Sequence, residues 1–343
     1  MTIILAKAIA LVAALAGLDG IQADDGDQAA VAKVVREAHT TNWSDTTQVV
    51  IQAHVPGPAM WKLTQGTSTV WVLGVLEQTP QDLTWDTRRL RRTLSGAHAL
   101  ILPGHTTVSP EALRQWDNYS RRPPAQQLPN DIPVSAENRI DRLVRTEPGI
   151  YGMDRRFKRV RLGVEMHIVV RDNHHIAAYQ LVKDVEALPE TIGIPETVAF
   201  NLSGDDLARG LQKLSVAGED ACLDDYLDDI DWDIKVLPSV ARAWATGDIL
   251  ALEKDYRSPP GLVCNLLVPG WKEQYEAYNV SAMTHTLEGA LAKPGKSVAL
   301  VPLGDLLRKG GVLDRLQSEG VVITSPPSDA PSGDAPSPTD APK

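Results

Sequence analysis

Apolar residues recur at intervals that predict a helix and several strands near the N-terminal end. Residues 28–38 carry valines and alanines at helical spacing, which predicts a short helix. Residues 48–54 are strand-like. Residues 59–63 and 68–75 flank a Gln-Gly-Thr turn, and the second segment is rich in β-branched and aromatic residues, so the two predict a β-hairpin.

The hairpin leads into a further helix and strand. Thr84 or Asp86 can cap a helix over residues 87–94, and residues 97–102 have the pattern of a buried strand. This β-β-α-β order is typical of the first half of an α/β layer structure. The outer face of the predicted helix carries four basic residues, Arg88, Arg89, Arg91 and Arg92.

The second half of the chain begins with helices and ends with strands. Residues 162–170 predict a buried strand, and residues 205–253 predict a long helical region. A βαβ-like unit follows, with helices over 281–292 and 311–318 and strands over 297–303 and 321–324. Because strands lie toward both ends, we expect an α/β fold with one mixed β-sheet built from both ends of the chain and a largely helical middle.

Residues 1–23 have the features of a secretory signal peptide. Lys7 precedes an uncharged run over 8–18, and small residues follow it. As a helix this run spans about 16 Å, which is short of the roughly 30 Å of a bilayer core. We expect the signal to be cleaved and the protein to be periplasmic or secreted, with no integral membrane span afterwards. A retained N-terminal anchor or an unprocessed soluble segment are the alternatives.

The other end is compositionally biased. Residues 325–343 hold six of the 24 prolines and no large apolar residue, so we expect a disordered tail. The predicted organisation is therefore a signal peptide over 1–23, an N-terminal helix and strand extension over 24–56, an α/β domain over 57–324, and the tail.

Composition narrows the class of protein. The 343 residues are 43% hydrophobic and 23% charged, with a net charge of −10. This is ordinary globular composition, and the acidic balance argues against nucleic acid as a partner. In an oxidising compartment the only two cysteines, Cys222 and Cys264, are expected to form a disulfide, with two buried free thiols as the alternative.

Two charged segments are candidate binding sites. Eight of the fifteen residues over 219–233 are acidic, but apolar residues at helical spacing indicate the solvated face of a helix rather than a calcium loop. The basic run over 155–161 is compatible with an anionic polymer or lipid head group, although a solvated edge before a buried strand is the simpler interpretation. His167, His174 and His175 lack the spacing of a compact metal site.

Residues 57–85 (GPAMWKLTQGTSTVWVLGVLEQTPQDLTW) resemble the opening of the TraB/PrgY/GumN family, in which a Trp-containing strand and a turn lead into L-G-T-x-H. The resemblance continues in LGVEMHI (162–168), ARAWATGDILAL (241–252) and PGKSVALVPLGDLLRKGGVLDRLQSEGVVIT (294–324), so this chain looks like a divergent, secreted bacterial GumN-like member. It implies a three-layer α/β fold with a mixed sheet. Some members of the family are described as metal-dependent proteases.

The site residues of the family are altered in this chain. The resemblance aligns Glu77 with the histidine of the first G-x-x-H motif, Asp305 with the histidine of G-x-G-H-L, and Pro103 with a glutamate at a strand end. The glutamate of the G-x-E motif is kept as Glu165. Gly74, Gly304 and Gly311 persist around these positions, which suggests that the backbone turns remain.

Loss of both imidazoles removes the usual ligands of a zinc-type ion. We therefore expect a catalytically inactive protein that acts by binding an unknown protein or polymer ligand without a cofactor. The alternative is a metal-dependent, protease-like hydrolase in which Glu77, Glu165 and Asp305 form a rebuilt carboxylate site for a divalent cation. In that alternative these three residues are the candidate catalytic and metal-binding groups.

Overall fold

The computed structural model describes residues 25–39, 43, 57–121, 132–153, 156–258 and 260–326. Three expected features lie outside these residues: the targeting segment over 1–23, the strand over 48–54 and the tail beyond residue 326.

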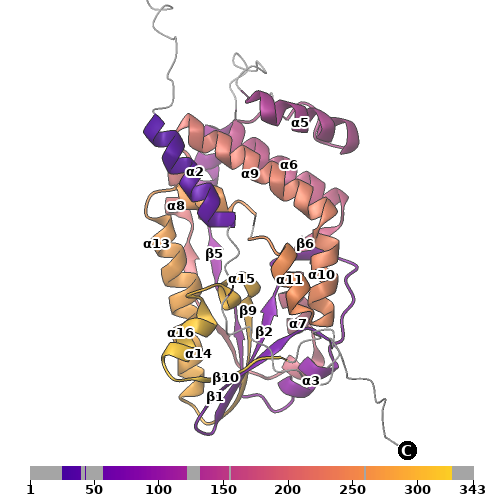
Figure 1. The fold of residues 1–343 in the computed structure, drawn as a ribbon, viewed down its shortest axis with the longest axis vertical. Coiled ribbons are helices and arrows are strands. Elements are labelled where there is room, and N and C mark those ends of the chain that lie inside the picture. The colour runs from indigo at the N-terminus through magenta and orange to yellow at the C-terminus, as the bar shows by residue number, and fades with distance from the viewer. Residues whose placement is uncertain are drawn as a thin grey trace, which may run out of the picture.

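A six-stranded mixed sheet forms the centre of the molecule, in the order β10-β1-β2-β9-β4-β7 (Figure 1). β1 pairs antiparallel with β2 and β10, and the pairs β2–β9, β9–β4 and β4–β7 are parallel. The sheet therefore draws on both ends of the chain, as predicted, and β7 joins it from the middle. The strands are β1 (Met60–Gln65), β2 (Ser68–Val75), β4 (Ala99–Leu102), β7 (Glu196–Val198), β9 (Gly295–Pro302) and β10 (Val322–Thr324).

Helices cover both faces of this sheet, which gives the three-layer arrangement that the family resemblance implies. In Figure 1, α14 (Met283–Leu291) and α16 (Val312–Ser318) lie on one side of the strands, and α3 (Arg88–Leu94) and α10 (Leu237–Thr246) lie on the other. The inner strand β9 is buried on both faces, which explains its continuous apolar run. The N-cap residue of α3 is Thr87, whose side chain makes no capping hydrogen bond, but the preceding Asp86 accepts the Arg88 N–H on its Oδ1 at 2.9 Å.

The prediction of a buried strand over 162–170 is wrong. These residues belong to helix α6 (Arg159–Asn173), which packs along α9 (Val216–Lys235). Leu162, Met166 and Val170 are fully buried and recur every four residues, in one apolar cluster with residues of α9. The valine-rich composition suggested a strand, but the spacing of the buried positions is helical.

The acidic segment is helical, as predicted, but its carboxylates are only partly on a solvated face. Asp225, Asp229 and Asp233 in α9 are at most 4% exposed, because other helices pack around α9 and bring polar partners with them. Asp233, for example, accepts a hydrogen bond from Gln78 and lies 2.8 Å from His167 Nε2. A buried carboxylate needs such partners to offset its desolvation.

Two residues of the basic run are paired with nearby carboxylates. Arg159 Nε lies 2.8 Å from Asp220, and Arg161 pairs with Glu165 and Asp117. Arg155 lies outside the described residues. In the part of the chain that the structure describes, no helix is long and apolar enough to cross a membrane.

The remaining elements are short strands, connecting helices and the N-terminal helix. The helix predicted over 28–38 is α2, and the predicted helical region over 205–253 contains α8 to α11. The bounds are α2 (Asp25–His39), β3 (Gln78–Pro80), β5 (His105–Thr107), α4 (Pro110–Ser120), α5 (Val134–Thr146), β6 (Ile176–Ala178), α7 (Gln180–Glu186), η3 (Pro189–Thr191), β8 (Asn201–Ser203), α8 (Asp205–Leu211), α11 (Ile249–Asp255), α12 (Leu262–Leu267), α13 (Trp271–Tyr275), the π-helical segment η4 (Glu276–Ala282) and α15 (Leu303–Leu307).

Candidate functional site

The parallel pairing of β2 and β9 brings two of the predicted site residues to the same end of the sheet. Val75 at the end of β2 is in register with Pro302 at the end of β9. Glu77 follows β2 by two residues, and Asp305 lies in the one-turn helix α15 directly after β9. Ligand sites of α/β sheets are commonly found at this carboxyl end.

Asp305 is a buried carboxylate with one free oxygen. It is 2% exposed, and its Oδ1 accepts a hydrogen bond from the Tyr275 hydroxyl at 3.0 Å. Arg308 Nε lies 3.5 Å from the same oxygen, and Arg308 Nη1 donates to Glu276 at 2.6 Å. Among the described residues, Asp305 Oδ2 and Arg308 Nη2 are buried without a hydrogen-bond partner. Burial raises the pKa of Asp305 to about 6, opposed by the charge of Arg308 and the Tyr275 hydrogen bond.

Glu77 completes a pair of interacting carboxyl groups. Burial raises its pKa to about 8, and the charge of Asp305 adds to the shift. Three tyrosine hydroxyls lie near both carboxyl groups. Burial, together with the charges of Glu77 and Asp305, raises the pKa of Tyr179 to about 12. The same causes hold the pKa values of Tyr256 and Tyr275 well above the ordinary value for tyrosine. We refer to Glu77 and Asp305 as the carboxyl pair.

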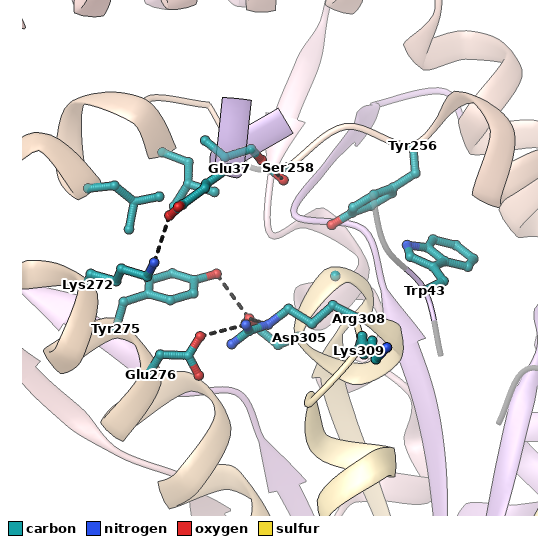
Figure 2. A pocket seen from close by; sticks show the side chains of 14 residues that line it. Glu37, Trp43, Tyr256, Ser258, Lys272, Tyr275, Glu276, Asp305, Arg308 and Lys309 are labelled. Carbon is teal, nitrogen blue, oxygen red and sulfur yellow. Dashed lines mark hydrogen bonds and ion pairs between the residues drawn. The ribbon is translucent and has the colours of Figure 1, made fainter. Parts of the chain in front are cut away.

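A cavity of about 540 Å³ opens on Asp305 (Figure 2). Its wall combines aromatic and charged side chains, with the Trp43 and Tyr256 rings 5.8 Å apart and the Lys272 ammonium 2.8 Å from Glu37. The residues that line it carry equal numbers of formal positive and negative charges. They are Glu37, Ala38, Trp43, Tyr256, Ser258, Leu262, Leu266, Lys272, Tyr275, Glu276, Gly304, Asp305, Arg308 and Lys309.

Glu165, the third predicted site residue, lies in a different set of contacts. It is in helix α6 and forms an ion pair with Arg161, one turn before it. Arg161 also approaches Asp117. Neither Glu77 nor Glu165 is among the residues that line the cavity, but the charge of Asp305 raises the pKa of Glu77, so Glu77 and Asp305 lie close enough to interact. The structure therefore brings together two of the three candidates.

These residues fit a transition-metal site poorly. The carboxyl pair offers two oxygen-bearing groups, no histidine lines the cavity, and Pro103 follows β4 at the position where the resemblance places a carboxylate. Within the described residues, no group of three or more His, Cys, Asp and Glu side chains is placed to hold a metal ion. A carboxyl group with a pKa near 8 has to release its proton before it can bind a metal ion, so metal binding at Glu77 would depend on pH.

The glycines shared with the family are required by close packing rather than by positive φ angles. A Cβ on Gly304 would lie 2.7 Å from the Tyr256 hydroxyl, and a Cβ on Gly74 would lie 2.5 Å from Leu303 Cδ1. A Cβ on Gly311 would lie 2.5 Å and 2.6 Å from two backbone carbonyl oxygens. All three have ordinary φ angles, so close packing rather than a positive φ accounts for glycine at these positions.

Several residues of the site carry no motif in the sequence. Tyr256 and Tyr275 come from the helical middle, and Glu37 and Trp43 come from the N-terminal extension. Arg308 has a local signal, since it stands three residues after Asp305 and lies close to it.

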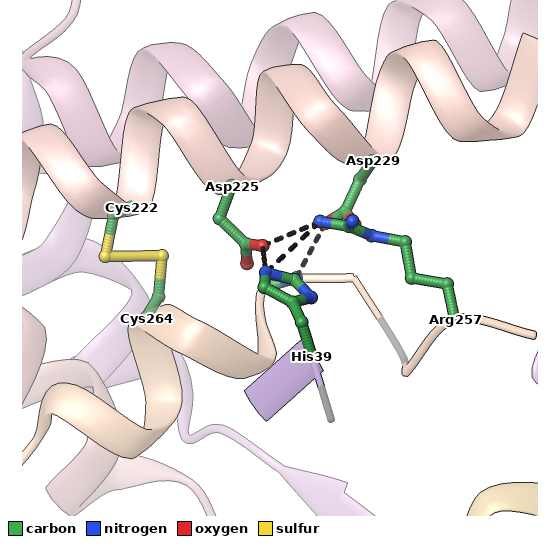
Figure 3. The surroundings of a disulfide bond; sticks show 7 residues. His39, Cys222, Asp225, Asp229, Arg257 and Cys264 are labelled. Atoms are coloured by element: carbon green, nitrogen blue, oxygen red, sulfur yellow. Dashed lines mark hydrogen bonds and ion pairs between the residues drawn. A yellow bond between two sulfur atoms is a disulfide. The ribbon is translucent and has the colours of Figure 1, made fainter. Parts of the chain in front are cut away.

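The two cysteines lie side by side, as predicted. Cys222 in α9 and Cys264 in α12 place their Cα atoms 4.9 Å apart, with the sulfurs at bonding distance (Figure 3). This separation fits disulfide geometry. Both residues are at most 1% exposed.

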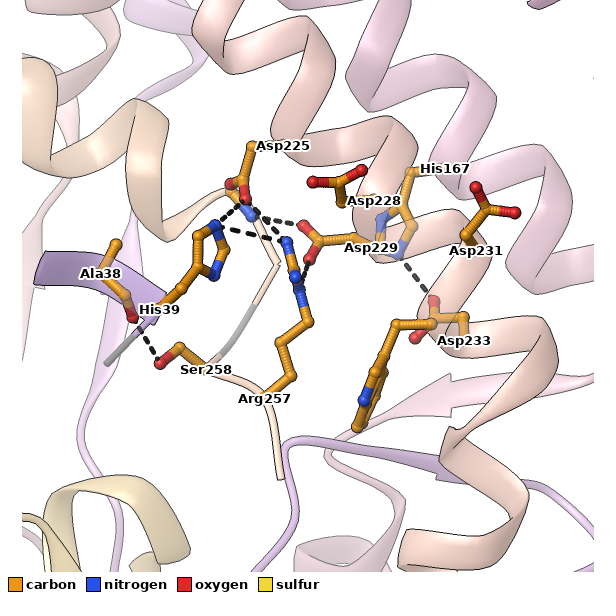
Figure 4. Close-up of polar contacts among 12 residues, drawn as sticks. Ala38, His39, His167, Asp225, Asp228, Asp229, Asp231, Asp233, Arg257 and Ser258 are labelled. Carbon is orange, nitrogen blue, oxygen red and sulfur yellow. Dashed lines mark hydrogen bonds and ion pairs between the residues drawn. The ribbon is translucent and has the colours of Figure 1, made fainter. Parts of the chain in front are cut away.

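A buried ionic cluster adjoins this cysteine pair (Figures 3 and 4). Arg257 donates to Asp229 and Asp225, and His39 Nε2 lies 2.9 Å from Asp225 Oδ1. The Gly261 N–H donates to the second oxygen of Asp229 at 3.1 Å. The cluster therefore joins α9 to the end of α2 and to the loop that carries the cavity residues Tyr256 and Ser258.

Among comparisons with known proteins, only the comparison with protein-family models gives a match. Neither the curated proteins nor the solved structures contain a match to this chain. The model of the TraB/PrgY/gumN family matches residues 59–325, which is most of the chain and includes β1 through β10 and the carboxyl pair. The chain therefore belongs to the TraB/PrgY/gumN family.

Proposed function

We propose that this protein is an extracytoplasmic member of the family that binds a small polar molecule in the Asp305 cavity and lacks the family's metal-dependent chemistry. The observation that carries the proposal is the carboxyl pair: Glu77 and Asp305 occupy the positions where the resemblance places imidazoles, and burial raises the pKa of both. A site of this kind retains a shaped cavity without the ligands that select a transition metal.

The cavity supports binding by a polar, electrically balanced molecule. Asp305 Oδ2 is an unused acceptor and Arg308 Nη2 an unused donor, so a ligand group that both donates and accepts satisfies the two atoms together. The Trp43, Tyr256 and Tyr275 rings provide apolar surface beside these polar atoms. A few placed polar groups within an apolar wall are typical of small-molecule sites.

Two observations support the proposed extracytoplasmic location. Residues 8–18 form the apolar run of a signal peptide behind Lys7, and the cysteines stand at bonding distance, as expected in an oxidising compartment.

Metal analysis tests the proposal directly. The purified chain is incubated separately with Zn²⁺, Mn²⁺, Mg²⁺ and Ca²⁺, dialysed and assayed for retained metal and for casein hydrolysis. We expect far less than one ion per chain and no hydrolysis. One retained ion per chain that is lost in Glu77→Gln and Asp305→Asn, but kept in Glu165→Gln, overturns the proposal.

A metal-independent acid/base hydrolase is the second candidate, because the pKa values of the pair are separated. With values of about 8 and about 6, Glu77 is protonated and Asp305 ionised near neutral pH, which is the arrangement of a general acid beside a general base. Metal-free casein or peptide hydrolysis with a bell-shaped pH profile between these values, abolished in Asp305→Asn, favours this candidate. Native mass spectrometry that detects a bound small molecule in the wild type, but not in Asp305→Asn, favours binding.

A further inference from the structure

The sheet face around Trp71 is only partly covered by helices. Lys62 on β1 is in register with Trp71 on β2, and Thr64 is in register with Val322 on β10. Residues in antiparallel register share a face, so these side chains lie on one side of the sheet, opposite the buried Leu63. Val322 is 64% exposed, whereas Leu63 is fully buried against the core.

The Trp71 indole is partly buried against the core, and two cations lie within about 6 Å of its ring. Lys62 Nζ lies 5.8 Å and Arg89 Cζ 5.6 Å from the ring centroid. Arg89 comes from α3, the helix whose arginines stood out in the sequence, and Arg92 follows it on the exposed surface. We call Lys62, Trp71, Arg89, Arg92 and Val322 the Trp71 face.

Within the described ranges, the cations of this face are not held in ion pairs, although Asp86 is close enough to Arg92 for the charge of Arg92 to lower the pKa of that carboxyl group. The neighbouring arginines of α3 have carboxylate partners, Arg88 with Asp86 and Arg91 with Glu190. Among the described residues, no carboxylate forms an ion pair with Lys62, Arg89 or Arg92. Burial lowers the pKa of Arg89, and the like charge of Arg92 lowers it further.

This local charge stands out against a chain whose net charge is −10. An anionic surface repels most of the molecule and attracts the Trp71 face, so it orients the protein with that face inward. Segments that bind at a membrane–water interface also combine cations with an aromatic ring and exposed apolar side chains. In such segments the ring lies at the level of the lipid head groups.

We propose that the Trp71 face is a docking surface for a membrane that contains anionic phospholipid. Lys62, Arg89 and Arg92 lie against the phosphate groups, and Trp71 and Val322 contact the boundary between head groups and acyl chains. The site is independent of the carboxyl pair, because it lies on the hairpin β1–β2, β10 and α3 and shares no lining residue with the Asp305 cavity.

Vesicle flotation tests this proposal with the full chain. Vesicles of phosphatidylcholine alone are compared with vesicles of phosphatidylcholine and phosphatidylglycerol, at low and at raised salt. We expect binding to the mixed vesicles only, weakened by salt. The Arg89→Gln/Arg92→Gln variant should bind roughly twenty-five-fold more weakly, since each cation near such a surface contributes about five-fold.

The control variant Lys213→Gln/Lys254→Gln makes the same change of charge at two exposed lysines elsewhere and should bind within about two-fold of wild type. The tryptophan emission shift that accompanies vesicle binding should be reduced in Trp71→Phe. Equal binding to both kinds of vesicle, or an equal loss of binding in the control variant, overturns the proposal. Complete displacement by millimolar inorganic phosphate also overturns it, because the site then recognises a free anion.

Discussion

Arg257 bridges two carboxylates on successive turns of helix α9: its Nε donates to Asp229 Oδ1 at 2.6 Å and its Nη2 to Asp225 Oδ1 at 2.9 Å. Both aspartates are at most 4% exposed. Burial and the charge of Asp225 raise the pKa of Asp229 to about 6, and Arg257 opposes this shift. The guanidinium is therefore the main counter-charge of a desolvated acidic cluster.

Removing the Arg257 side chain should lower the stability of the folded protein. Arg257→Ala leaves two buried carboxylates without their cation, and the free energy of unfolding is expected to fall by about 3–5 kcal/mol at neutral pH. Urea denaturation measures the change. Arg209→Ala is the matched control, because Arg209 pairs with Asp206 on the surface and should cost less than about 1 kcal/mol. Equal costs in the two variants would contradict the account of the cluster.

Glu77→Gln should change how stability depends on pH. The folded chain holds the Glu77 proton up to a pKa of about 8, whereas the unfolded chain releases it near 4.5. Raising the pH between these values therefore weakens the wild type, and the non-titrating glutamine escapes this loss. We expect similar stabilities at pH below about 4.5 and a variant more stable by a few kcal/mol above about pH 8.

Chemical denaturation across this pH range measures the effect. Glu111→Gln serves as the control, because Arg114 and Gln115 lower the pKa of the exposed Glu111 carboxyl. Its substitution should give a small trend of opposite sign. A Glu77→Gln profile parallel to that of the wild type would show that Glu77 is not desolvated.

Gly304→Ala should disturb the cavity wall. The new methyl group would lie 2.7 Å from the Tyr256 hydroxyl, and we expect a loss of about 1–3 kcal/mol in unfolding free energy. Adding Tyr256→Phe removes that oxygen and should recover part of the loss. Gly289→Ala is the control, since nothing lies within 4 Å of its Cβ position in helix α14. It should be neutral or stabilising by about 0.5–1 kcal/mol.

The cysteine pair gives a further prediction. The unfolded, unreduced chain should show no free thiol, since both cysteines lie at bonding distance across a sequence separation of 42. Reduction, or the Cys222→Ala/Cys264→Ala variant, should lower stability by about 2–4 kcal/mol. Thiol titration and denaturation with and without reductant measure both effects. Two reactive thiols in the unreduced chain would contradict the pairing.

The sheet could be predicted from sequence because its strands have simple patterns. The hairpin over 59–63 and 68–75 and the strand over 297–303 lie within one or two residues of β1, β2 and β9. Helix α6 could not be recognised as easily, since its composition is rich in valine and its buried positions are masked by further apolar residues. Tertiary packing against α9 decides its conformation.

The burial of the acidic residues in the helical middle was harder to predict from sequence than the strands of the sheet. The spacing of Asp225, Asp229 and Asp233, four residues apart, marks one face of α9, but a single sequence gives no sign that this face is covered by Arg257, His39 and His167. Those partners come from distant segments. A solvated face was therefore the natural expectation, and the packing of helices around α9 overturned it.

The carboxyl pair followed from the resemblance, because both residues stand at fixed offsets from paired strands. Glu165 did not join it, since its helix turns that carboxylate toward Arg161. The tyrosines around the pair lie in loops and helices without a motif. Their positions depend on the assembled fold.

Helix α2 and Trp43 precede residue 59, where the family match begins, yet Glu37, Ala38 and Trp43 form one wall of the Asp305 cavity. A chain trimmed to the family boundaries would therefore lose these lining residues and expose the Asp305 carboxylate to bulk water. Ligand screens should start from protein that retains its N-terminal extension. Relatives with a different extension are expected to share the residues around Asp305 but to bind different ligands.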